Sequence, residues 1–226
     1  TAAFGVPTSW ARLQRQLAGT PDAAMLRTLR LAASAGEALP VATWEAVHDT
    51  TGLRLLNSLG SSEATNFYLS DRPGRPRAGT VGWPVPGFRV RVIAADGHDA
   101  EPGCEGEAWA QGASVTPGYL GDPQATARTL VDGWLRTGDR VVREPDGSHT
   151  FIGRIGDRFK AGAFWIDPIR IQEALLQLEM VGQAVVVGPT NAGKSALVAA
   201  LTGAEAPVSP IPNTTWEPLP GMMPVE

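Results

Sequence analysis

Glycine and proline interrupt this chain too often for any long regular element, and this punctuation constrains the fold more than any other feature. The 226 residues include 26 Gly and 19 Pro, which stand between short apolar runs and do not form one tract. Glycine supplies turns through its access to positive φ, and proline through its fixed φ. We therefore expect many short elements joined by tight turns, with no disordered linker.

Composition and charge exclude several classes of protein. Hydrophobic residues make up 43% and charged residues 19% of the chain, as in ordinary globular proteins, and a net charge of −4 gives no electrostatic basis for binding nucleic acid or a membrane. No apolar run approaches the length of about 18 residues that a spanning helix needs. Cys104 is the single cysteine, which excludes an internal disulfide and fits a reducing, cytoplasmic compartment. No secretory signal is visible at the start. The sequence opens at Thr1 and not at an initiator Met, so we expect it to begin inside a longer protein.

The first third of the chain has α/β character. Apolar positions at helical spacing predict a helix over 9–19 that ends at Gly19 and a second over about 40–50, with Pro40 near its first turn. Residues 26–40 indicate a strand that runs into a glycine turn. Residues 53–70 indicate a strand, a loop of small residues and another strand.

The pattern changes after about residue 79. Residues 79–152 carry short alternating runs separated by Gly, Pro and Asp, which is typical of antiparallel strands in a small barrel or sandwich. A further helix, again opened by a proline, is predicted over 168–178.

A phosphate-loop pattern lies close to the end of the chain. The stretch "VVVGPTNAGKSALVAALTG" (185–203) fits G-x-x-x-x-G-K-[ST] between a predicted strand and a predicted helix. Lys194 would reach the β- and γ-phosphates of a nucleotide, and Ser195 would bind Mg²⁺, while backbone N–H groups and the helix N-terminus face the phosphates. The residues of the loop are Gly188, Asn191, Ala192, Gly193, Lys194 and Ser195.

Other chemically suggestive residues have ordinary explanations. His48, His98 and His149 show no metal-ligand spacing. Cys104 lies in a Pro/Gly turn and has no histidine partner nearby in sequence, so we interpret it as a surface or half-buried thiol. The seven Trp are interpreted as residues of the core or of a barrel face, not as a stacking platform.

Six stretches, in order, resemble the adenylate-forming superfamily, which contains acyl- and aryl-CoA ligases, luciferases and the adenylation domains of peptide synthetases. They are "FGVPTSWARL", "SAGEALP", "GSSEATNFYLSDRPG", "GTVGWPVPGFRVRV", "GWLRTGD" and "FIGRIGDRFKAGAFWIDP". Within the superfamily, the chain most resembles the branch that contains benzoate-CoA ligase and its relatives. The resemblance covers about residues 1–180 and implies a partial adenylate-forming fold, an α/β core with a small antiparallel barrel or sandwich.

The resemblance also implies a two-step reaction. A small-molecule carboxylate attacks the α-phosphorus of ATP to give an acyl-adenylate and pyrophosphate, and the thiol of coenzyme A then displaces AMP. The first step brings anions together and needs Mg²⁺ and positive groups.

Site residues follow from the same resemblance, position by position. Gly36, Glu37 and Ala38 match the segment that flanks adenine, and small side chains there let a planar base lie against the backbone. Ser62 matches the hydroxyl residue at the α-phosphate, and Glu63 matches the Mg²⁺ ligand. Asp139 matches the carboxylate that holds the ribose hydroxyls, and Arg154 the basic residue near ribose and phosphate.

Three departures from the superfamily pattern predict that the chain alone is inactive. A Ser/Thr/Gly-rich loop ending in Lys would lie before residue 1, and a lid with a catalytic Lys should continue after about residue 187. Gly156 stands where the hinge normally has Asp or Lys, although Asp157 and Lys160 keep their places. We divide the chain into an α/β piece (1–78), a β-rich subdomain (79–152), the hinge and start of the lid (153–183) and a truncated phosphate-loop strand–loop–helix segment (184–226).

The last forty residues resemble the start of a different family, the Obg/Drg-type GTPases. "PNTT" falls where the first switch carries a Thr that senses Mg²⁺, so Thr214 and Thr215 are both candidates, and GTP becomes a candidate ligand. We therefore interpret the chain as two unrelated fragments joined at about 178–186. A recombined or mis-assembled reading frame is favoured over an evolved bifunctional enzyme. The alternatives to a ligase fragment are a GTP-binding module on an inactive ligase scaffold and a non-functional chimera.

Overall fold

The structure is a computed structural model that describes residues 1–161, 164–178, 181, 184 and 186. Contacts divide the chain into two compact units, Thr1–Ile155 and Gly156–Glu226. Among the described residues, no helix has the length and apolar character needed to cross a membrane.

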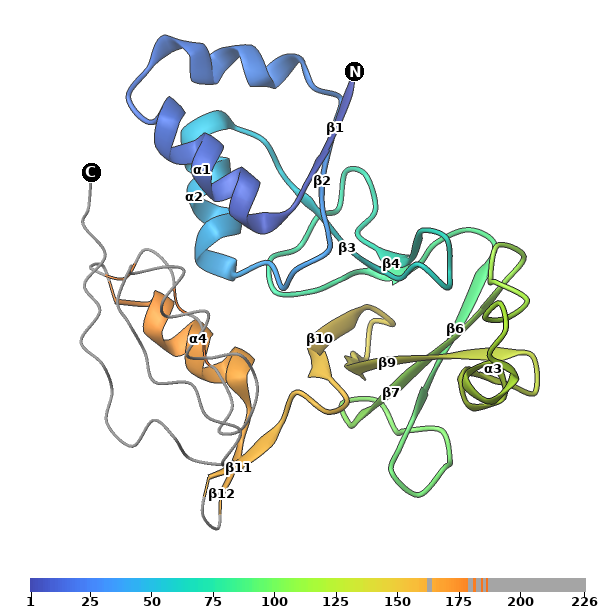
Figure 1. Cartoon of the computed structure of the whole chain (residues 1–226). Coiled ribbons are helices and arrows are strands. Elements are labelled where there is room, and N and C mark those ends of the chain that lie inside the picture. Colours follow the sequence, from blue (N-terminus) through green and yellow to red (C-terminus); the bar gives the residue numbers. More distant parts are fainter. Residues whose placement is uncertain (162–163, 179–180, 182–183, 185, 187–226) are drawn as a thin grey trace. The chain divides into compact units, whose positions relative to one another are not determined.

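The first sheet of unit 1 is built on a β–helix–β–helix–β pattern. Strands β1 (Ala2–Gly5), β2 (Leu31–Ser34) and β3 (Leu56–Gly60) run parallel, and β4 (Phe67–Ser70) and β5 (Trp83–Pro84) extend the sheet in antiparallel fashion. The crossovers contain α1 (Pro7–Leu17), the 3₁₀ helix η1 (Pro21–Thr28) and α2 (Val41–Thr51). In Figure 1, α1 and α2 lie side by side along β1–β3.

Two tryptophans fix these helices to the sheet. The indole N–H of Trp10 donates to the Ala33 carbonyl at 3.2 Å, and that of Trp44 donates to the Leu55 carbonyl at 2.8 Å. A buried indole needs such an acceptor. A Cβ at Gly5 would stand 3.1 Å from the Trp10 ring, so the glycine lets the indole approach β1. Both tryptophans therefore contribute to packing, as the sequence predicted.

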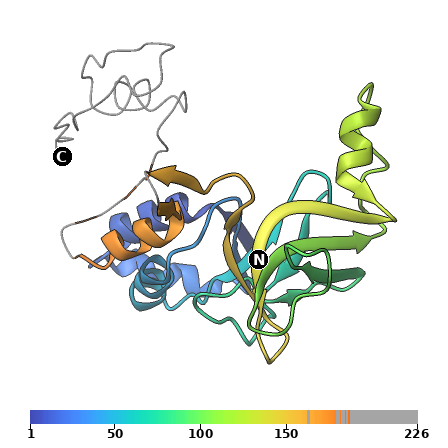
Figure 2. The same ribbon diagram turned by 90° about the horizontal axis from the view of Figure 1, so that it is seen from below.

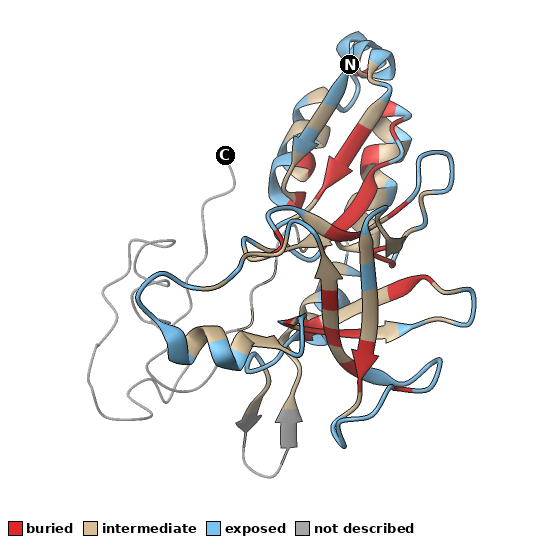
Figure 3. Cartoon of the chain, turned by 90° about the vertical axis from the view of Figure 1, so that its right-hand side faces the viewer, coloured by how far each residue is buried: buried red, intermediate tan, exposed pale blue. Residues whose placement is uncertain are grey.

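The second sheet of unit 1 is entirely antiparallel, in the order β10–β9–β7–β6. Its strands are β6 (Phe88–Ile93), β7 (Glu105–Gly112), β9 (Trp134–Arg143) and β10 (His149–Arg154), with β8 (Leu130–Val131) paired to β9 and α3 (Pro123–Thr129) before it. β7 and β9 lie side by side as long, bent strands (Figure 2). Buried side chains concentrate on the strands of both sheets (Figure 3).

A common core joins the two sheets. Tyr68 and Leu69 of β4 pack with Ala108 and Ala110 of β7 and with Val141 of β9, all at 0% exposure. The prediction of antiparallel strands after residue 79 is confirmed. The first of those strands, β5, completes the first sheet instead of joining the second.

Two element boundaries differ from the sequence predictions. The first helix is shifted to Pro7–Leu17, and Gly19 follows its C-cap with a φ of +75°. The strand predicted from residue 26 begins only at Leu31, because Pro21 opens a 3₁₀ helix through Thr28 that packs Leu26 on the core. The helix over about 40–50 is confirmed as Val41–Thr51, and Gly52 caps it in the left-handed conformation.

Unit 2 is described only at its start. The strands β11 (Phe159–Ala161) and β12 (Phe164–Ile166) pair antiparallel, and α4 (Pro168–Leu176) confirms the helix predicted over 168–178. Arg158 pairs with Asp167 at 3.2 Å, just before α4. The predicted phosphate-loop segment falls outside the described residues except for Ala184 and Val186, neither of which is in a strand.

Candidate active site

A pocket of about 270 Å³ opens in unit 1 where the loop after β3 meets β7, α3 and β9. Its lining is polar and carries charges of both signs. The lining residues are Glu63, Glu107, Tyr119, Arg128, Thr129, Leu135, Arg136, Thr137, Gly138 and Arg154. Two of the predicted site residues, Glu63 and Arg154, therefore meet in one pocket although they are far apart in sequence.

Glu63 lies in the loop between β3 and β4. The Tyr119 hydroxyl donates to its Oε1 at 2.6 Å, and the backbone N–H of Thr116 donates to its carbonyl at 2.7 Å. The hydrogen bond from Tyr119 lowers the pKa of the Glu63 carboxyl below its usual value, and Ser61 and Arg154 act in the same direction. Glu63 is thus an ionised oxygen donor near neutral pH.

Asp139 is 4% exposed, and its partners include Tyr68 and Arg154. The Tyr68 hydroxyl donates to Asp139 Oδ2 at 2.5 Å, and Arg154 Nε lies 3.3 Å from Asp139 Oδ1. Burial and the Asp139 charge raise the pKa of Tyr68 well above its usual value, so the phenol stays a donor. The Asp139 carboxyl group thus lies beside the pocket and contacts the Tyr68 phenol and the Arg154 guanidinium.

Gly138 of β9 lines the pocket and precedes Asp139. Gly138 has a φ of +72°, where glycine is favoured, and its carbonyl accepts from the Ile155 N–H at 2.7 Å. Arg154 donates from Nη2 to the Thr137 carbonyl at 3.1 Å. Thr137, Gly138 and Asp139 therefore form an irregular site inside β9, and hydrogen bonds link it to the end of β10.

The other predicted nucleotide residues lie outside the lining of this pocket. Gly36, Glu37 and Ala38 follow the carboxyl end of β2, and Ser62 follows that of β3. Because β2 and β3 are parallel, both segments lie at the same edge of the sheet, where α/β proteins bind ligands. Glu37 accepts from the N–H and the hydroxyl of Thr8, at 3.3 and 3.2 Å.

Sequence reasoning missed six polar residues of the pocket lining, among them Glu107, Tyr119 and Arg136. Tyr119 donates to the Glu63 carboxylate, and Glu107 accepts from the Gly138 N–H. Arg136 pairs with Glu107 at 3.0 Å. Tyr119 lies in a turn of Gly, Pro and Asp that marks no chemistry by itself, and Glu107 and Arg136 look like ordinary exposed positions of strands. No local signal could have identified them.

The remaining site and hinge residues that the sequence singled out come after unit 1 in the chain. Gly156 has a φ of +98° at the start of unit 2, and nothing lies within 4 Å of a Cβ built there. The phosphate-loop and switch candidates lie outside the described residues: Gly188, Asn191, Ala192, Gly193, Lys194, Ser195, Thr214 and Thr215.

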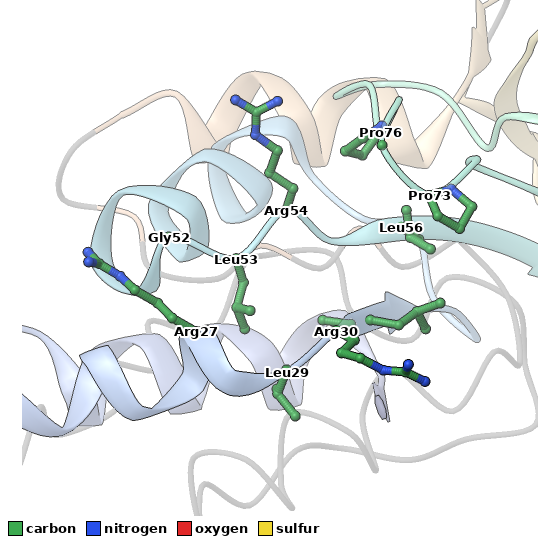
Figure 4. A pocket seen from close by; sticks show the side chains of 12 residues that line it. Arg27, Leu29, Arg30, Gly52, Leu53, Arg54, Leu56, Pro73 and Pro76 are labelled. Carbon is green, nitrogen blue, oxygen red and sulfur yellow. The ribbon is translucent and has the colours of Figure 1, made fainter. Parts of the chain in front are cut away.

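A second, larger pocket of about 440 Å³ lies at the amino ends of β2 and β3. Arg27, Arg30 and Arg54 line it together with Leu53 and Leu56. The three guanidinium groups point in different directions and do not converge on one point (Figure 4). This pocket therefore lacks the focused charge of the first.

Comparison with known proteins identifies the family and the fold. Residues 1–120 match the family described as AMP-binding enzyme. The chain belongs to this family. Its relatives and structural neighbours identify the fold as part of the adenylate-forming ligase fold. A separate match to the family described as 50S ribosome-binding GTPase covers residues 183–226, nearly all of them outside the described part.

Aryl-CoA ligases are prominent among the similar proteins. Benzoate–CoA ligase of Thauera aromatica is 36% identical over 188 residues, which cover 82% of this chain and 35% of that protein. The 4-hydroxybenzoate–CoA/benzoate–CoA ligase of Rhodopseudomonas palustris is 34% identical over 187 residues, 83% of this chain and 34% of that protein. The structure of a benzoate CoA ligase from Burkholderia xenovorans LB400 matches with a TM-score of 0.74 and 31% identity over 85% of this chain and 38% of that one. The chain thus spans about a third of the length of these ligases.

Proposed function

We propose that this chain is the part of an aryl-CoA ligase that binds ATP and the acyl-adenylate formed from an aromatic carboxylate. The observation that carries the proposal is the convergence of Glu63 and Arg154 on one pocket, with Asp139 held beside it by Tyr68 and Arg154. Family membership and the benzoate-ligase relatives support the same conclusion.

Each residue then has a definite task. Asp139 accepts hydrogen bonds from the ribose hydroxyls, and Arg154 offers its remaining N–H groups to ribose or phosphate. The residues 36–38 flank adenine, and the Ser62 hydroxyl contacts the α-phosphate. The substrate carboxylate attacks the α-phosphorus, pyrophosphate leaves, and the thiol of coenzyme A later displaces AMP.

The donor set suits Mg²⁺ bound together with nucleotide phosphates. Mg²⁺ is usually held by one or two carboxylates plus phosphate oxygens and water. Glu63 supplies one such ionised carboxylate, and the described residues contain no cluster of three or more His, Cys, Asp or Glu that could form a complete protein cage. Mg²⁺ held by Glu63 would offset charge on the phosphates during the first step.

Binding of a non-hydrolysable benzoyl-adenylate mimic, a sulfamoyl adenosine, tests the proposal on the full chain. We expect the parent to bind it and Asp139→Asn to weaken binding about tenfold or more, because hydrogen bonds to a charged group contribute about 1.5–3 kcal/mol each. Asp99→Asn is the matched control, since Asp99 is also paired with an arginine, Arg91, but lies on an exposed hairpin. Equal effects of the two substitutions would refute the assignment of Asp139.

We further propose that adenylate formation by the chain alone is slow. Positioning and electrostatic groups commonly contribute about 10²–10³ each in rate, and the superfamily's phosphate-loop Lys and lid Lys have no counterpart among these 226 residues. Carboxylate-dependent exchange of pyrophosphate into ATP measures this. Vigorous exchange that Glu63→Ala abolishes would contradict the expectation.

A second candidate function concerns the end of the chain. The match of residues 183–226 to the 50S ribosome-binding GTPase family favours a phosphate-binding segment there, with GTP as a candidate ligand. Tight, GTP-selective binding that Lys194→Ala removes would support a GTP-binding module fused to a ligase scaffold. Absence of such binding would favour a ligase fragment or a chimera without function at that end.

A further inference from the structure

Two loops that border the candidate active site are fastened to each other. The first, residues 61–66, follows β3 and contains Glu63, and the second, residues 113–119, follows β7. Three hydrogen bonds to backbone carbonyls join the two loops. Thr116 donates its N–H to the Glu63 carbonyl at 2.7 Å, and the Ser114 hydroxyl donates to the Ala64 carbonyl at 2.9 Å. The Thr65 hydroxyl donates to the Ser114 carbonyl at 2.7 Å. The position of the Glu63 backbone therefore depends on the second loop.

The conformation of the first loop is itself costly. Thr65 has a φ of +68°, which a β-branched residue rarely adopts. Such strain persists only where the surroundings hold it, and it concentrates at functional sites. The bond from the Thr65 hydroxyl to Ser114 is one interaction that holds it.

Tyr119 supplies a fourth bond, and it is the one that reaches the Glu63 carboxylate. Its own backbone is fixed, because its N–H donates to the Thr126 hydroxyl of α3 at 2.9 Å. That hydroxyl donates in turn to the Asp122 carbonyl at 2.9 Å, and the Asp122 side chain caps α3. A Cβ at Gly118 would stand 2.8 Å from the Thr126 side chain, so the turn before Tyr119 requires glycine. The phenol is thus presented to Glu63 by a braced turn.

We propose that Tyr119 is a positioning residue that orients the Glu63 carboxylate for Mg²⁺ bound with ATP. This inference rests on the proposed function and adds a residue to it. A carboxylate has about four lone-pair sites on two oxygens, so a single bond to Oε1 leaves acceptor capacity for a metal. Tyr119 therefore pre-organises Glu63 and does not compete with the cation.

Mg²⁺ titration of ATP affinity on the full chain tests this. All variants carry Lys194→Ala, so that the phosphate loop predicted near the end contributes little. We expect Tyr119→Phe to raise the Mg²⁺ midpoint, the concentration that gives half of the change in ATP affinity, about three- to tenfold. The reason is the loss of one charge-assisted hydrogen bond, which water partly replaces. ATP affinity in EDTA should stay unchanged. Glu63→Gln should remove most of the Mg²⁺ dependence.

Thr150→Val is the matched control, because the Thr150 hydroxyl donates to the Glu144 carboxylate at 2.7 Å away from the pocket lining. It should leave the Mg²⁺ midpoint unchanged. An unaltered midpoint in Tyr119→Phe, or a lower one that shows competition, would overturn the role of Tyr119 alone. A parent chain that binds no ATP at any Mg²⁺ concentration would overturn the proposed function and this inference together.

Discussion

A hydrogen bond between the buried side chains of Tyr68 and Asp139 links the two sheets of unit 1. It joins β4 to β9 across 71 residues of sequence, at 2.5 Å and with both side chains buried. Tyr68→Phe removes one oxygen and keeps the ring that fills the core. The substitution therefore isolates the bond from the packing.

The expected cost follows from what remains around Asp139. A hydrogen bond to a charged group contributes about 1.5–3 kcal/mol net, and a buried acceptor that loses a donor incurs a desolvation penalty of about 1–3 kcal/mol. Arg154 still pairs with Asp139, so the penalty is partial. We expect Tyr68→Phe to lower the free energy of unfolding by about 2–3 kcal/mol, a large fraction of the usual 5–15 kcal/mol.

Urea denaturation at pH 7.5, followed by circular dichroism, measures this cost in two backgrounds. In Asp139→Ala the phenol has lost its carboxylate acceptor, so a second change of Tyr68 to Phe should cost about 0.5 kcal/mol or less, or even stabilise the chain. Tyr119→Phe is the control on the chain's other tyrosine, which is 38% exposed and should cost well under half as much. Equal costs of Tyr68→Phe in both backgrounds would refute the reasoning.

Three further outcomes are expected. Burial raises the pKa of Asp71 to about 6, above an unfolded value of about 3.9, so this group stabilises the fold as pH falls through 6 and loses that contribution as pH rises. Burial lowers the pKa of His149, which changes stability with pH in the opposite direction, so the parent must be compared with Asp71→Asn. The difference between their free energies of unfolding should shift in the parent's favour by about 2–3 kcal/mol from pH 8 to pH 4. A difference that does not change with pH would contradict this expectation. Gly82→Ala should destabilise the chain by more than about 3 kcal/mol in the same urea assay, because its Cβ would stand 2.1 Å from the Ser70 carbonyl oxygen. Gly97→Ala is the control: Gly97 also has a positive φ, but nothing lies within 4 Å of its Cβ, so the cost should be about 1 kcal/mol. Similar costs for the two variants would count against steric exclusion at Gly82. Finally, nucleotide binding near the end of the chain should be no tighter than roughly high micromolar, about 4–6 kcal/mol, and Lys194→Ala should remove most of it; isothermal titration with ATP and GTP decides this.

Local chemistry made much of the fold predictable from sequence. Glycines that punctuate the chain, such as Gly36 and Gly52, adopt positive φ at turns and caps, and Pro168 opens a helix at the expected residue. The boundary error at residues 26–28 arose because a short 3₁₀ helix and a strand start look alike over three residues. The family motifs identified the superfamily because they are contiguous in sequence, and the match over residues 1–120 bears this out.

Only the tertiary structure decided how the site is assembled. No pattern within a strand or loop announces that Tyr68 will meet Asp139, or that Tyr119 will meet Glu63 across 56 residues. Such pairs depend on the packing of one sheet against the other and on the irregular pairing of β7 with β9 around Gly138. Sequence alone determines which backbone turns and which reactive groups are available, because these are local properties. The distances between those groups, and hence their ionisation and their possible ligands, are fixed by contacts that form only when the whole unit is folded.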